Sequence, residues 1–259
     1  MPSDLFPALF IGHGSPMNIF ADNDFTRDMI KLGRSLPKPD AIVVISAHWL
    51  TRGTFITSGL NPEQIYDFYG FPQALYKYRY KAPGSPETAT SVSAAAGQNI
   101  IIHDDNRGID HAAWAILKHI FPLQNIPVIE LSLNTTREPL YHFELGRKLT
   151  VLRSKNILVI GSGNIIHNLS EIDFNEDAKP FAWATEFDLQ VKTIIESRDF
   201  NNLINYQKIG PAAIRAIPYF DHYLPMLYVL GMTEKRENIR FIHESIQNGS
   251  ISMRSFQVE

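Results

Sequence analysis

Short apolar runs alternate with helical patterns along most of the chain, and this alternation is the feature that most restricts its fold. The runs are rich in Ile, Val and Leu, are too short for helices, and predict buried strands at residues 8–11, 41–45, 99–102, 128–133 and 157–160. Helical patterns are found at residues 24–36, 87–96, 111–120, 139–152 and 181–195. Strands that alternate with helices favour an α/β fold, with a central, mostly parallel sheet flanked by helices.

The last part of the chain departs from this alternation. Two strand-like stretches, residues 239–246 and 251–258, flank Asn248-Gly249, a dipeptide typical of hairpin turns. We therefore expect a mixed sheet with an antiparallel edge and a C-terminal β-hairpin. No linker rich in Pro, Gly or Ser divides the chain, so residues 1–259 are predicted to form a single domain. Residues 61–84 are dense in Tyr, Phe and Pro, and predict an aromatic surface or lid rather than a regular element.

Composition excludes several classes of site and partner. The chain has no cysteine, so disulfides, thiolate zinc sites, iron–sulfur clusters and cysteine nucleophiles are ruled out. Its net charge is −3 and no basic stripe stands out, which argues against nucleic acid as a partner. No stretch approaches the about 18 apolar residues of a membrane-spanning helix, and residues 1–4 lack the basic start of a secretory signal. We expect a cytoplasmic protein with no membrane partner.

Four histidines lie in short motifs of turn-forming or polar residues, most of them just beyond an apolar run: Gly12-His13-Gly14, Ala47-His48-Trp49, Gly161-Ser162-Gly163-Asn164 followed by His167, and Asp221-His222. A fifth, His111, has a similar setting at a predicted helix start. Imidazole is the commonest protein ligand of catalytic metals and the usual acid or base near neutral pH. Because strand ends in an α/β fold can converge on one pocket, the set predicts a mononuclear, mostly histidine-ligated metal enzyme with one or two histidines left for proton transfer. The remaining histidines are assigned to surface or core: His103, His119, His142 and His243.

Each motif also has a structural interpretation when it is taken alone. A histidine such as His48 at the end of a buried strand is often a hydrogen-bonded core residue, and Asp221 can cap the helix that follows it. The glycine-rich turn at residues 161–164 could cradle a phosphate, but it contains no Lys or Arg. The chain has no H-E-x-x-H zinc motif and no G-x-S-x-G nucleophile elbow, and nothing in the sequence pairs Ser15 with a base.

Taken together and in order, these motifs resemble the class III extradiol ring-cleavage dioxygenases, in particular their 4,5-DOPA dioxygenase (LigB-like) branch. The motifs that carry the resemblance are Gly12-His13-Gly14-Ser15-Pro16, Ser46-Ala47-His48-Trp49, Gly108-Ile109-Asp110-His111, Gly161-Ser162-Gly163-Asn164 with His167-Asn168, and Asp221-His222-Tyr223-Leu224-Pro225. Tyr69-Gly70-Phe71-Pro72 also resembles that branch. The resemblance spans nearly the whole chain, from about residue 8 to about residue 232.

The resemblance implies an enzyme that opens the aromatic ring of a small, DOPA-like catechol with O2 as co-substrate, in aromatic compound catabolism. It implies one mononuclear divalent metal, with Fe(II) expected for dioxygenase chemistry and Zn(II) as the alternative bound ion. His13, His48 and His222 match metal-binding positions. His167 matches a histidine that is either a further ligand or the acid/base, and His111 matches a catalytic histidine near the substrate. Motif residues beside these histidines are expected to bind the substrate: Ser15, Trp49, Asp221 and Tyr223.

Two positions of the chain depart from the pattern of the branch. Ala112 stands where the branch commonly has glycine, and Ile217-Pro218 stands where His-Pro is expected, a change that we expect to affect substrate choice.

Two other functions fit the same histidines. A zinc-dependent hydrolase could use the same site, with His167 as base to a zinc-bound water. A binding protein without catalysis could also keep the fold, because a fold does not fix a function.

Overall fold

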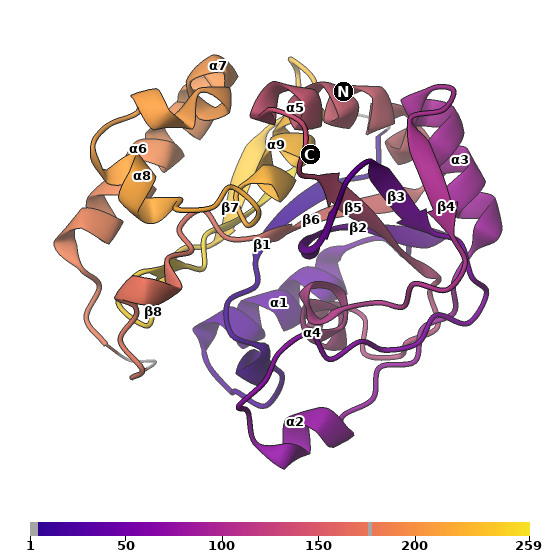
Figure 1. Ribbon diagram of the computed structural model, residues 1–259, viewed down its shortest axis with the longest axis horizontal. Helices are drawn as coiled ribbons and strands as arrows, with labels where there is room; N and C mark the ends of the chain where they lie inside the picture. The colour runs from indigo at the N-terminus through magenta and orange to yellow at the C-terminus, as the bar shows by residue number, and fades with distance from the viewer. Residues whose placement is uncertain (1–4, 176–177) are drawn as a thin grey trace.

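An eight-stranded sheet forms the centre of the molecule (Figure 1). The computed structural model describes residues 5–175 and 178–259. The sheet has the order β4-β3-β5-β2-β6-β1-β10-β7, and its strands are β1 (Ala8–Gly12), β2 (Ala41–Thr51), β3 (Thr54–Thr57), β4 (Ile101–Asp104), β5 (Val128–Asn134), β6 (Ile157–Gly163), β7 (Ile239–His243) and β10 (Ser255–Val258). The four neighbours β5, β2, β6 and β1 run parallel, whereas β10 pairs antiparallel with both β1 and β7. This confirms the predicted mixed, mostly parallel sheet.

Helices cover both faces of this sheet (Figure 1). One face packs against α1 (Asp24–Ser35) and α4 (His111–Ile120), and the other against α3 (Pro86–Ala96), α5 (Pro139–Leu149), α6 (Ala182–Ser197) and α9 (Leu224–Gly231). Adjacent strand residues point to opposite faces, so Val43 of β2 belongs to one core and Val44 to the other. Burial on both faces explains why the parallel strands read as unbroken apolar runs rather than as alternating patterns.

The predicted helix starts agree with the structure where a capping side chain is present. The hydroxyl oxygen of Ser85 accepts the backbone N–H of Thr88 at the start of α3, with Pro86 in the first helical position, and Asp110 caps α4 by accepting the N–H of Ala112. Shorter elements complete the fold: α2 (Gln73–Lys77), α7 (Phe200–Ile204), α8 (Ala212–Ala216) and the 3-10 helices η1 (Pro16–Ile19), η2 (Thr150–Lys155), η3 (Leu169–Glu171) and η4 (Tyr206–Lys208).

Several strands differ from their predicted bounds. β2 and β6 extend beyond residues 45 and 160, where the predicted strands end, to Thr51 and Gly163. Strand β4 begins at Ile101 instead of residue 99, because Asn99 has a φ of 57° and its backbone lies in the left-handed region, outside the range of a strand. Strand β3 was not predicted, because Thr54–Thr57 is short and half polar.

The C-terminal hairpin is present but divided into two ladders. β7 pairs with β10 in the main sheet, and between them β8 (Ile246–Gln247) and β9 (Ile251–Ser252) form a small sheet of their own. The turn lies at Asn248 and Gly249, whose φ angles of 52° and 74° are those that this dipeptide accepts most readily.

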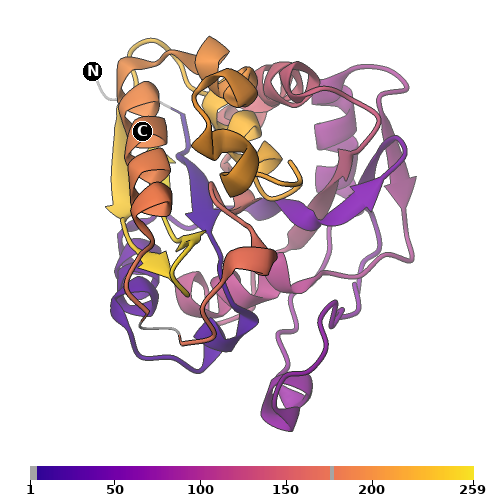
Figure 2. The same ribbon diagram turned by 60° about the vertical axis from the view of Figure 1, so that its left-hand side comes forward.

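The aromatic segment (residues 61–84) extends from the body of the molecule and carries α2 at its tip (Figure 2). Tyr66, Phe68 and Tyr78 pack against Trp114 of α4, with ring centroids 5.8–6.0 Å from the Trp114 ring. Residues 1–4, which entered the prediction on the secretory signal, lie outside the described residues. Among the helices that are described, none is both long and apolar enough to cross a membrane.

Candidate metal centre

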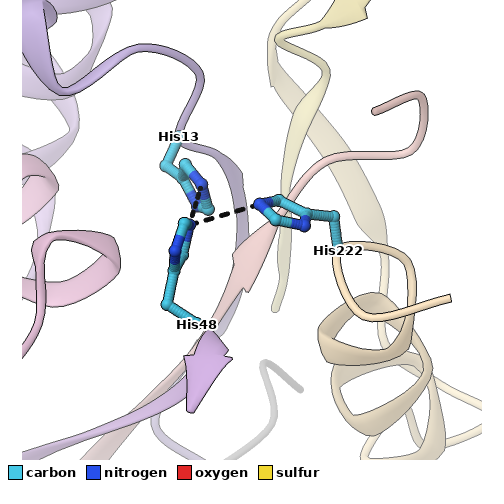
Figure 3. A group of neighbouring side chains, drawn as sticks. All are labelled: His13, His48 and His222. Atoms are coloured by element: carbon cyan, nitrogen blue, oxygen red, sulfur yellow. Dashed lines mark hydrogen bonds between the residues drawn. The ribbon is translucent and has the colours of Figure 1, made fainter. Parts of the chain in front are cut away.

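Three imidazole rings meet at the carboxyl edge of the parallel strands (Figure 3). His13 follows the end of β1, His48 lies near the end of β2, and His222 precedes α9. Nε2 of His48 is 3.2 Å from Nε2 of His13 and 3.2 Å from Nε2 of His222. A ligand atom from each of the three residues therefore lies within 4.8 Å of the others, as a single bound ion requires. The predicted convergence of these histidines is what the structure shows.

Strand β6 holds the His222 segment in place through its glycines. A Cβ atom added at Gly163 would lie 2.1 Å from the carbonyl oxygen of His222, and one added at Gly161 would lie 2.4 Å from the carbonyl oxygen of Pro225. The backbone N–H of Asn164 donates to the carbonyl of His222 at 2.8 Å. The predicted glycine-rich turn is therefore part of β6, where its glycines let the chain before α9 approach the sheet closely, and this packing role accounts for the glycines without a phosphate.

The outer nitrogens of His13 and His48 have polar neighbours that leave Nε2 facing inward. The buried hydroxyl of Ser162 donates to the carbonyl of Ala112 at 2.6 Å, so its oxygen accepts the Nδ1–H of His13 at 3.1 Å. A carboxylate oxygen of Asp67 lies 2.9 Å from Nδ1 of His48. Such outer partners fix the tautomer of metal-binding histidines, and three neutral imidazoles suit iron or zinc. The donor set therefore fits one divalent transition metal.

Electrostatics divide the three rings into two kinds. Burial, followed by the charges of neighbouring histidines, holds the pKa of His13 and of His222 well below the usual value, so both rings are neutral and ready to bind a metal. Burial also lowers the pKa of His48, but the hydrogen bond to Asp67 and the nearby carboxylate of Asp110 outweigh it, and the net pKa is raised. A ligand imidazole must be deprotonated at the nitrogen that binds, so a bound cation would compete with a proton for Nε2 of His48.

His111 lies in the same histidine cluster. It is the first residue of α4, directly after the capping residue Asp110, and its ring centroid lies 4.1 Å from that of His48 and 5.6 Å from that of His13. Its Nδ1 lies 2.9 Å from both carboxylate oxygens of Asp67. Burial and the charge of His48 lower the pKa of His111. The ring is therefore neutral and available for a hydrogen bond.

His167 lies beside the three-nitrogen group and is not part of it among the residues that the structure describes. Its ring stacks on that of His222, with centroids 3.4 Å apart and an angle of 7° between the planes. Its backbone N–H donates to the carbonyl of Ala216, which fixes the loop that follows β6. Burial lowers the pKa of His167 to about 4. Of the two predicted roles, this stacked position favours the acid/base over the fourth ligand.

One of the four predicted substrate-binding residues points elsewhere. Tyr223 is 1% exposed and its hydroxyl donates to the carbonyl of Leu203, so the prediction for Tyr223 is wrong. Trp49 is buried and the Arg107 guanidinium covers its ring, and its assignment to the substrate stays a prediction.

The other two predicted substrate-binding residues stay beside the centre. Asp221 is adjacent to His222 with its side chain 24% exposed, and Ser15 is partly exposed two residues beyond His13, so both remain predictions. Ile217, where the branch has histidine, is 4% exposed and belongs to the core.

Asp67 of the aromatic segment was missed as a candidate functional residue. Asp67 contacts two of the histidines, and the ring centroid of Phe68 lies 5.4 Å from that of His111. The sequence signal that could have identified Asp67 is a carboxylate between two aromatic residues, Tyr66 and Phe68. The remaining histidines are at the surface or in the core as predicted: His103, His119, His142 and His243.

The sequence model of the family described as the catalytic LigB subunit of aromatic ring-opening dioxygenase matches residues 10–256. The chain belongs to this LigB family. Its curated relatives include a 4,5-DOPA dioxygenase extradiol of Escherichia coli strain K12, 43% identical over all of this chain and 96% of the relative. Another is the 4,5-DOPA dioxygenase extradiol of Beta vulgaris, 32% identical over 96% of this chain and 94% of the relative.

A solved structure supports the same assignment. The crystal structure of an uncharacterized protein from Escherichia coli K12 aligns with a TM-score of 0.86 and 39% sequence identity, covering 98% of this chain and all of that one. Membership of the LigB family and the names of its curated members make this chain an extradiol, aromatic ring-opening dioxygenase.

Proposed function

We propose that this LigB-family dioxygenase opens the ring of a small catechol, using one divalent metal held by His13, His48 and His222 and O2 as co-substrate. The convergence of three Nε2 atoms at the strand ends supports the proposal most strongly. Fe(II) is the metal that we expect to support turnover, because oxygen chemistry requires a redox-active ion. Zn(II) can occupy the same three nitrogens and has no redox chemistry of its own.

When bound, the metal supplies positions on which a catecholate and O2 are held together and charge passes between them. The side chains around it bind, orient and protonate the substrate. His167 accepts a hydroxyl proton from the catechol and later returns one, as a general base and then a general acid. His111 faces the ring with a neutral imidazole, and Phe68 beside it provides an apolar wall against the aromatic substrate.

DOPA-like catechols are the substrate class that we expect. The curated relatives named above are 4,5-DOPA dioxygenases, and Asp221 offers a partly exposed carboxylate next to His222 that can bind a polar substrate group. We also propose that the protein acts in aromatic compound catabolism in the cytoplasm.

The proposal is tested by loading the metal-free protein with Fe(II) under anaerobic conditions and then adding O2 with DOPA or with simpler catechols. A yellow ring-opened product is expected with the iron-loaded protein and none with the zinc-loaded protein, which serves as the matched control. Absence of product and of O2 uptake across the whole catechol panel would refute the proposal. Hydrolysis of esters or amides by the zinc-loaded protein without O2 would support a hydrolase instead.

A further inference from the structure

Asp67 reaches two catalytic histidines from a part of the chain that is remote from both. Its Oδ2 atom lies 2.9 Å from Nδ1 of His48, and each of its carboxylate oxygens lies 2.9 Å from Nδ1 of His111. The backbone N–H of His111 also donates to Oδ1 at 3.1 Å. The Asp67 side chain is only 17% exposed, so these contacts are largely shielded from competing water.

The chemistry of the carboxylate determines how the two rings are arranged. An ionised carboxylate only accepts hydrogen bonds, so each Nδ1 atom that faces it must carry a hydrogen. The lone pair of His48 is then on Nε2, which faces His13 and His222. In a neutral His111 the free lone pair is likewise on Nε2, on the side away from Asp67. One acidic side chain therefore orients a metal ligand and a substrate-side histidine together.

The aromatic segment brings Asp67 to this position. Trp114 donates its indole N–H to the carbonyl of Ile65 at 2.9 Å, and Phe68 packs against both Trp114 and His111. These contacts fix the residues on either side of Asp67. The carboxylate is thus the polar contact through which residues 61–84 dock onto the histidine cluster.

We propose that Asp67 is a positioning residue that orients His48 for the metal and His111 for the substrate, and so couples docking of the aromatic segment to the metal centre. This inference rests on the proposed function, since it takes the His13, His48 and His222 group as the metal site. It assigns a role in the centre to a segment that carries none of the ligands.

Asp67→Asn is the most direct variant, because it keeps the size of the side chain and changes its hydrogen bonding. In either orientation of the amide, its N–H group stands where a carboxylate oxygen lies 2.9 Å from Nδ1 of His111, and that group cannot accept a hydrogen bond. At least one ring must turn or change tautomer. Asp67→Glu keeps the acceptor and serves as the rescue variant. Glu63→Gln is the matched control, since it makes the same chemical change at an exposed position of the same segment.

The first readout is Zn²⁺ affinity, measured by competition with a chromophoric chelator on freshly metal-stripped protein. Loss of an outer partner of a metal-binding histidine typically weakens metal affinity about 10–100-fold, and we expect this for Asp67→Asn, with partial recovery in Asp67→Glu and no change in Glu63→Gln. The second readout is the rate of trypsin cleavage after the exposed Lys77 and Arg79. Faster cleavage of Asp67→Asn than of Glu63→Gln is expected, with urea unfolding to confirm that both variants fold.

The outcomes separate this inference from the proposed function. If the unchanged protein binds no Zn²⁺, the proposed metal site fails whatever Asp67 does. If it binds one Zn²⁺ and Asp67→Asn binds it equally well, the metal site stands and the role of Asp67 is refuted. Two Zn²⁺ per chain, with one lost in Asp67→Asn, would make Asp67 a ligand of a second ion with His48 and His111 and would also overturn the inference.

Discussion

Ser162→Ala removes a single buried oxygen, and the structure predicts two separate effects. That oxygen accepts from Nδ1 of His13 at 3.1 Å and donates to the carbonyl of Ala112 at 2.6 Å, with Ser162 0% exposed. Each lost hydrogen bond contributes about 1 kcal/mol, so the unfolding free energy of the metal-free protein should fall by about 2 kcal/mol. His13 also loses the partner that fixes its tautomer, which should weaken metal binding about 10–100-fold, equivalent to about 1.4–2.7 kcal/mol.

Two measurements separate these effects. Urea unfolding in the presence of a strong chelator gives the stability of the metal-free protein, and chelator competition gives the Zn²⁺ affinity. Ser132→Ala is the matched control, because Ser132 is equally buried and its hydroxyl contacts Thr51 and the backbone N–H of Phe55, both at 2.7 Å. We expect both variants to lose similar stability and only Ser162→Ala to lose affinity. Equal affinities in the two variants would refute the assignment of His13 as a metal ligand supported by Ser162.

Three further substitutions test other parts of the account. His167→Gln should keep the Zn²⁺ affinity but slow turnover about 10²–10⁴-fold, and a large loss of affinity would instead make His167 a ligand. Gly163→Ala places a Cβ atom 2.1 Å from the carbonyl oxygen of His222, so it should lower both stability and metal affinity, whereas Gly210→Ala, whose nearest contact is at 3.8 Å, should change neither. Burial lowers the pKa of His142 to about 4, so between pH 6.5 and 4 the unfolded chain binds a proton that the folded protein excludes, and stability falls as the pH falls. His142→Phe should reduce that loss, measured by urea unfolding at pH 7 and 4.5, by about 2–3 kcal/mol, and an unchanged pH dependence would contradict burial of a neutral ring.

The parallel core and the histidine cluster were predictable because their signals are local. Each core strand is a run of apolar residues, and the capping side chains of Ser85 and Asp110 mark helix starts. Once the strands are parallel, their carboxyl ends share one edge, and residues such as His13 and His48 that follow or end them must lie close together.

The remaining features depend on contacts that sequence spacing does not encode. Asp67 contacts His48 and His111 only after an irregular segment has folded back on α4. Such a segment has no hydrophobic periodicity from which its path could be predicted. Tyr223 was assigned to the substrate because it adjoins His222, but its side chain points into the core at the start of α9. Adjacency in sequence therefore identified the motif correctly and the Tyr223 side chain wrongly.

The central claim is that three histidines hold one metal for ring opening by O2. It is tested most directly by measuring iron content, O2 consumption and ring-opened product in the same sample. Iron-loaded protein with a measured iron content per chain is mixed with a limiting amount of catechol in an oxygen electrode, and the ring-opened product is quantified in the same sample. The account predicts activity that rises in proportion to iron up to one ion per chain, with one O2 consumed for each ring opened. Product formation without O2 consumption, or full activity in protein stripped of metal, would contradict it.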